Sequence, residues 1–111
     1  MENMRRVKIT VIECRYNEKI ALQYANLENK NLKQCPIHQE GQVFYTYWKK
    51  PDGVCDEAWK ALSHYVFALS NNGHSFFNGN MVRFPNMAIV TCPDGFKTTT
   101  FKVETCDDDE G

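Results

Sequence analysis

The sequence predicts a single α+β domain, with the element order β-α-β-α-β-β and two helices packed on one face of a mixed sheet. Some segments alternate apolar and polar residues, as half-buried strands do. Two others repeat apolar residues every three to four positions, as helices do. A chain of 111 residues with 42% hydrophobic content is also large enough to enclose one core.

The first two predicted elements are a strand and a helix. Apolar and polar residues alternate from Val7 to Val11, which predicts a strand over residues 6–15. Asn17 then offers an N-cap for a helix that we expect to reach about Asn29. The apolar positions of this helix recur at the spacing of one face: Ile20, Tyr24 and Leu27.

A second strand and a second helix follow. Residues 43–48 combine β-branched and aromatic side chains, which is typical of a strand. Residues Pro51 to Gly53 interrupt it, and a helix is predicted from Asp56 until Asn71-Asn72-Gly73 ends it. One face of this helix carries Ala58, Leu62, Tyr65 or Val66, and Leu69.

The last part of the chain predicts a long loop and a hairpin. Residues 74–85 show no period, and we expect Phe76, Phe77 and Phe84 to pack back onto the core while the loop covers a pocket. Two strands, over residues 87–91 and 96–104, are joined by a tight turn at residues 92–95. In this turn Gly95 is expected to have a positive φ.

Charge and hydropathy give the expected boundaries and location. The domain is expected to span residues 1–105, and residues 106–111 to form an acidic disordered tail. The net charge is −1, and without the four terminal acidic residues it is +3, with no dense basic block. No apolar run approaches the roughly 20 residues that span a bilayer, so we expect a cytoplasmic protein with no membrane partner.

Three of the five cysteines lie in turn-forming segments: Cys35 before Pro36, Cys55 after Asp52-Gly53-Val54, and Cys92 before Pro93-Asp94-Gly95. Thiolates act as nucleophiles or metal ligands where they remain reachable and stabilised, and the ends of elements offer both. None of the three shares a CxxC pair with another, so the local signal of a zinc finger is missing. Cys55 directly precedes the second predicted helix, whose N-terminus favours an anion.

The chain resembles a small uncharacterised family of roughly hundred-residue proteins from anaerobic bacteria and archaea, which has three characteristic cysteines. The similar segments are Val7 to Val11, Cys35-Pro36 with Gly41-Gln42, Gly53-Val54-Cys55 with Ala58-Trp59, and Cys92-Pro93-Asp94-Gly95 with Phe101-Lys102. This resemblance implies that Cys35, Cys55 and Cys92 belong to one site. It also implies that Cys14 and Cys106 lie outside the pattern, and it brings no established activity.

Three converging thiolates would suit zinc, copper(I) or an iron–sulfur cluster, with His38 as the candidate fourth ligand because it is close to Cys35. We therefore expect a metal or redox site at Cys35, Cys55 and Cys92, with a small molecule or a redox protein as partner. Metal-free thiol chemistry stays open. The alternative is a non-catalytic ligand-binding or protein-interaction module whose cysteines only pack, so the sequence does not decide whether the protein is an enzyme.

Aromatic residues next to lysines, at Tyr45, Tyr47, Trp48, Lys49 and Lys50, also raise the question of nucleic-acid binding. Strand alternation assigns Tyr45 and Tyr47 to one face and Phe44 to the other, so one of these sets is expected in the core. Because the chain has no wider basic stripe, nucleic acid is not an expected partner. A homodimer is compatible with the sequence.

Overall fold

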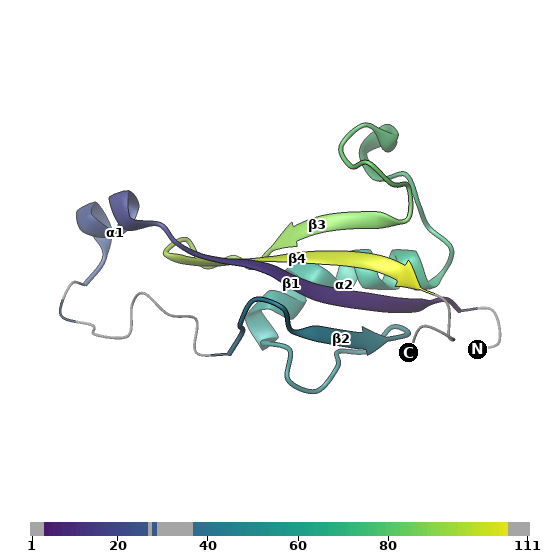
Figure 1. Ribbon diagram of the computed structural model, residues 1–111, viewed down its shortest axis with the longest axis horizontal. Helices are drawn as coiled ribbons and strands as arrows, with labels where there is room; N and C mark the ends of the chain where they lie inside the picture. Colours follow the sequence, from purple (N-terminus) through teal and green to yellow (C-terminus); the bar gives the residue numbers. More distant parts are fainter. Residues whose placement is uncertain (1–3, 27, 29–36, 107–111) are drawn as a thin grey trace.

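A computed structural model describes residues 4–26, 28 and 37–106 of the chain. In chain order, the elements are β1 (Arg6–Tyr16), α1 (Glu18–Tyr24), β2 (Val43–Thr46), α2 (Asp56–Ser70), the short 3-10 helix η1 (Phe76–Gly79), β3 (Met87–Thr91) and β4 (Lys97–Cys106). The α+β class and the predicted order of strands and α-helices are confirmed. The strands form one sheet in the order β2-β1-β4-β3 (Figure 1).

Every strand pair in this sheet is antiparallel, whereas a mixed sheet was expected. The alternation of side chains in a sequence shows which residues share a face, but it does not show in which direction the neighbouring strand runs. The long β1 and β4 pair along most of their length, with a register shift between Val11 and Glu13. The structure thus places Ile12 at a bulge, where the strand bends.

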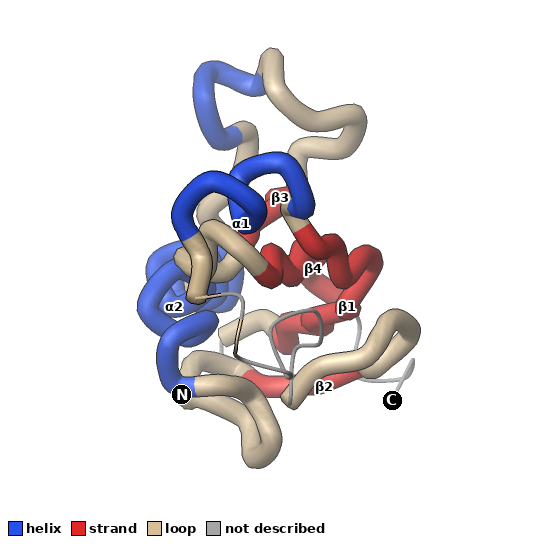
Figure 2. Tube along the Cα trace, turned by 90° about the vertical axis from the view of Figure 1, so that its left-hand side faces the viewer, coloured by secondary structure: helices blue, strands red, loops and turns tan. Residues whose placement is uncertain are grey.

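One face of the sheet forms the core with α2. The helix contacts β1, β3 and β4, and Figure 2 shows it lying along one side of the strands. The buried residues alternate along each strand and recur along one face of the helix, as the sequence predicts. They include Val7, Ile9, Val11, Leu62, Val66, Leu69, Ala88, Val90, Phe101 and Val103.

The first helix is shorter than predicted and does not cover the sheet. It ends at Tyr24, and Ala25 is already extended. Ile20 is 50% exposed and Tyr24 76% exposed, so the apolar stripe of this helix does not pack. A short helix depends on such packing for its stability, and α1 lies beyond one end of the sheet (Figure 1). The expected continuation over Leu27 and Asn29 lies outside the described residues.

Residues 74–86 form a projection, which we call the arm, at the start of β3 (Figures 1 and 2). Phe76 packs on the core and meets Tyr65 edge to face, with ring centroids 5.3 Å apart. The expected packing of Phe77 and Phe84 is wrong, because both side chains are more than half exposed. Ser75, Phe77 and Asn78 have positive φ angles, which are uncommon for residues other than glycine.

The C-terminal strand continues further than predicted. β4 ends at Cys106, which is buried and paired with Arg6, so this residue belongs to the sheet and not to the expected tail. Residues 107–111, the rest of that predicted tail, lie outside the described residues. Within the described part of the chain, no helix is both long and apolar enough to cross a membrane.

Candidate functional site

Cys55 occupies the N-cap position of α2, at the end of a tight turn. Gly53 enters this turn with a φ of +94°, and Val54 anchors it in the core. The carbonyl of Cys55 accepts the first helical hydrogen bond, from Trp59 N at 2.9 Å, while its thiol makes no capping bond. The thiol therefore stays available at the start of the helix, half-buried beside the core.

His38 fixes the backbone of Cys55. The ring is 3% exposed, and Nε2 accepts a hydrogen bond from Cys55 N at 3.2 Å. Since Nε2 is the acceptor, the hydrogen-bond network assigns the proton to Nδ1, which donates to Gln42 Oε1 at 2.9 Å. Phe44 and Phe101 flank the ring edge to face, with centroids 5.8 and 5.3 Å away.

This arrangement bears on the candidate role of His38 as a fourth metal ligand. Both ring nitrogens are engaged, so an ion could bind Nε2 only if the ring released the Cys55 N–H group. The histidine instead joins the segment before β2 to the start of α2. Sequence reasoning missed this role, because the partners lie 4 and 17 positions away in turn segments without any periodic pattern.

Cys92 follows β3 and begins the loop that returns the chain into β4. Its sulfur accepts a hydrogen bond from Thr99 N at 3.2 Å and donates to Lys97 O at 3.7 Å. The backbone N–H of Cys92 also donates to Thr99 O at 2.9 Å. An N–H group that points at the sulfur can stay in place when the sulfur becomes a thiolate or a metal ligand.

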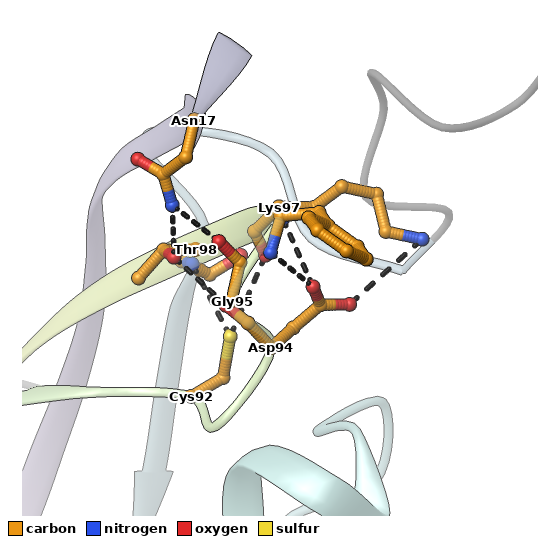
Figure 3. A network of polar contacts seen from close by, with 8 residues as sticks. Asn17, Cys92, Asp94, Gly95, Lys97 and Thr98 are labelled. Carbon is orange, nitrogen blue, oxygen red and sulfur yellow. Dashed lines mark hydrogen bonds and ion pairs between the residues drawn. The ribbon is translucent and has the colours of Figure 1, made fainter. Parts of the chain in front are cut away.

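The loop after Cys92 is closed by side chains, not by a left-handed glycine. Asp94 Oδ1 accepts hydrogen bonds from Phe96 N and Lys97 N, at 2.8 and 2.9 Å. Asn17 Nδ2, at the end of β1, donates to Gly95 O at 2.7 Å, and Figure 3 shows these contacts around the turn. The predicted positive φ of Gly95 is therefore wrong, since the positive-φ glycines of the described chain are Gly41, Gly53 and Gly79.

Cys55 and Cys92 line the same cavity, which has a volume of about 410 Å³. It lies between the start of α2 and the β3–β4 loop. Ile37, His38, Glu57, Ala58, Pro93, Asp94, Lys97 and Thr99 complete its lining. The structure thus brings together two of the three cysteines that the resemblance assigns to one site.

The other predicted ligand, Cys35, lies outside the described residues, as do its immediate neighbours. Ile37, two positions later in the sequence, lines the cavity. Among the described residues, no three His, Cys, Asp or Glu side chains are grouped as a metal-binding set. Cys14 donates from its sulfur to His38 O at 3.7 Å and does not line the cavity.

One buried hydroxyl at the cavity has no hydrogen-bond partner. Thr99 is 1% exposed, and its Oγ1 makes no hydrogen bond to any described residue. Buried polar atoms in proteins are nearly always paired, and the exceptions often mark places that a water or a ligand satisfies. Because Thr99 lines the cavity, its hydroxyl suits a small molecule or water bound there.

Charged side chains form part of the cavity lining. Glu57 and Asp94 contribute carboxylates, and Lys97 Nζ lies 3.9 Å from Asp94 Oδ2.

Asp56, the residue after Cys55, pairs with Lys50. The hydrogen bond from Lys50 and the positive charge of Lys50 lower the pKa of Asp56 below the ordinary aspartate value. Because the folded-state pKa is lowered, this attraction is present at neutral pH and is lost as the pH falls through that pKa. The pair is solvent-exposed, so its effect on stability is small.

The arm does not cover this cavity, contrary to the expectation for residues 74–85. It lies at the Met87 end of β3, whereas Cys92 follows the opposite end of the same strand. The lining of the cavity contains no residue of the arm.

Comparison of the chain with protein-family models, curated proteins and solved structures finds no match.

Proposed function

We propose that Cys35, Cys55 and Cys92 bind a thiophilic metal centre, a zinc ion or an iron–sulfur cluster, at the cavity between α2 and the β3–β4 loop. The observation that carries the proposal is that Cys55 and Cys92 line one cavity although 37 positions separate them in the sequence. Ile37 lines the same cavity. Cys35 is two positions before Ile37 in the sequence, and the proposal includes it because the family resemblance groups it with Cys55 and Cys92.

The surroundings of the two described sulfurs support this assignment. Thr99 N donates to the sulfur of Cys92, and backbone N–H groups of this kind stabilise metal-bound thiolates. Cys55 stands at the N-terminus of a 15-residue helix, where partial positive charge favours an anionic sulfur. His38 acts as a positioning residue that holds the backbone of Cys55. A centre held by three thiolates would leave one coordination position for a small molecule or for electron exchange.

Metal analysis of protein purified without oxygen tests the proposal. We expect about one zinc per chain, or iron with acid-labile sulfide and the visible absorption of a cluster. Replacing Cys35, Cys55 or Cys92 by serine should reduce metal affinity by more than the roughly 10–100-fold that is typical of losing an outer partner. Cys14→Ser is the matched control, because this half-buried cysteine lies outside the cavity lining. Equal metal content in all four variants would contradict the proposal.

A second candidate is a non-catalytic ligand-binding module whose cysteines only pack. The specific observation in its favour is the contact from Cys92 Sγ to Lys97 O at 3.7 Å, in which a thiol, but not a metal-bound sulfur, can donate a hydrogen bond. The cavity volume also falls in the range of small-molecule sites. Metal-free protein that binds a small molecule, with unchanged affinity after Cys55→Ser, would favour this module.

A further inference from the structure

Strand β3 forms one edge of the sheet, on the side away from β2. Edge strands are usually protected by charge, proline, bulges or short length. β2 has such protection, since it has four residues and Lys49, Lys50 and Pro51 follow soon after. The sequence of β3, Met-Ala-Ile-Val-Thr, contains no charge and no proline, and its pairing with β4 shows no register shift.

The hydrogen-bond pattern identifies which backbone groups of β3 face outward. Cys92 N donates to Thr99 O, and at the other end Thr105 N donates to Asn86 O. In an antiparallel pair, hydrogen-bonded residues alternate with non-bonded ones. Even-numbered residues from Asn86 to Cys92 therefore face β4. The N–H and C=O groups of Met87, Ile89 and Thr91 point away from the sheet.

These outward groups are self-complementary. If a second copy of β3 pairs antiparallel with a two-fold axis at Ile89, Ile89 lies opposite its own copy and Met87 lies opposite Thr91 of the second copy. All three outward residues then form hydrogen-bonded pairs, and no charges oppose one another across the contact. A two-fold contact of this kind uses the same surface patch on both subunits.

Exposed apolar side chains of the arm and of β3 would add to such a contact. Phe77, Met81, Phe84 and Ile89 are 64%, 71%, 55% and 47% exposed. With roughly 200 Å² for each large side chain, they offer on the order of 470 Å² per copy, or about 950 Å² for two. Stable interfaces bury about 1,200 Å² or more in total, so the strand backbone and its polar neighbours would have to supply the remainder.

The arm provides a groove beside the same edge. A cavity of about 130 Å³ lies between Phe76, Phe77, Met81 and Val82 of the arm and Met87 to Ile89 of β3. Figure 1 shows the arm beside the start of the strand. In the two-fold pairing, the end of the second copy's β3 lies next to this groove, because its Thr91 is opposite Met87.

We propose that the chain forms a two-fold homodimer by antiparallel pairing of β3 with β3 of a second copy. The pairing joins the two four-stranded sheets into one continuous sheet. This inference does not rest on the metal site, because it is argued from the outward backbone groups of β3 and the exposed side chains of the arm.

The test is the mass of the full chain in solution over roughly 1–200 μM, where dimerisation follows mass action. We expect a species of twice 12.9 kDa at the upper concentrations. Ile89→Lys places two ammonium groups opposite each other and should shift the chain to monomer. Val43→Lys is the matched control, because Val43 is a similarly exposed β-branched residue on β2, the opposite edge of the sheet.

Amide hydrogen exchange gives a second readout that needs no variant. Raising the concentration should slow exchange at Met87, Ile89 and Thr91, whose N–H groups point away from β4. A monomer at every concentration would overturn the proposal. So would a dimer that Ile89→Lys leaves intact, a dimer lost in Val43→Lys alone, or dimerisation without slower exchange at these three amides.

Discussion

At position 38, a buried imidazole bridges the segment before β2 and the start of α2. Its Nε2 accepts the Cys55 N–H, and its Nδ1 donates to Gln42. A phenylalanine would fill the same space, but it would leave the Cys55 N–H without this partner. The histidine therefore serves packing and hydrogen bonding together, and it sets where the backbone of Cys55 lies.

His38→Ala should lower the free energy of unfolding by about 2–4 kcal/mol, because it removes a buried ring and the hydrogen-bond partner of Cys55 N. Denaturant titration followed by circular dichroism measures the change. His64→Ala is the control, since His64 is exposed on α2, and we expect a change within about 0.5 kcal/mol there. Similar losses in both variants would show that His38 does not hold the structure as described.

The candidate site was only partly predictable residue by residue. Turn residues beside Cys55 and Cys92 indicate that both thiols lie at the ends of elements, and the structure confirms this for both. That they line one cavity was expected from the family resemblance, because their spacing leaves no local trace. The role of His38 and the N–H group of Thr99 were not predictable, since both depend on how distant segments pack.

At the scale of elements, the turn before α2 positions Cys55 in the lining of the cavity. Gly53 has a φ of +94°, and a Cβ built on it would lie 3.3 Å from Phe44 Cε1. Both the backbone angle and the neighbouring ring therefore disfavour a side chain at this position. At Gly95, by contrast, an added Cβ would meet nothing within 4 Å, and φ lies outside the left-handed region.

Gly53→Ala should destabilise the protein by about 1–2 kcal/mol, the usual penalty for a left-handed backbone with a Cβ. Gly95→Ala should change stability by less than about 0.5 kcal/mol. Thermal unfolding of the two variants measures this difference. Should Gly95→Ala prove the more damaging substitution, the description of both turns would be incorrect.

Helix α2 was predictable and the extent of α1 was not, for one physical reason. The apolar face of α2 meets the sheet, so its periodic pattern corresponds to real packing. The pattern of α1 has the same period, but Ile20 and Tyr24 remain exposed. A periodic pattern predicts that a helix has an apolar face, whereas the packing that stabilises a longer helix depends on tertiary structure.

At the scale of the whole molecule, β3 separates two different features. Its C-terminal end leads to Cys92 and the cavity beside α2. The arm and the exposed apolar side chains lie at its N-terminal end. The alternation of residues did not predict that every neighbouring pair of strands is antiparallel. Within one chain, the length of β3 separates the cavity from the arm. The proposed metal site and the proposed dimer contact rest on different residues, so the cysteine variants test the first and Ile89→Lys tests the second.

Alkylation measured at each cysteine tests most directly whether Cys35, Cys55 and Cys92 share one metal centre. Metal-free chain is pulsed with iodoacetamide, with and without zinc, and the label at each position is measured by mass spectrometry. Zinc should protect these three cysteines together and leave the half-buried Cys14 at its metal-free rate. If the three react at the same rates with and without zinc, or if only one is protected, the shared site does not exist.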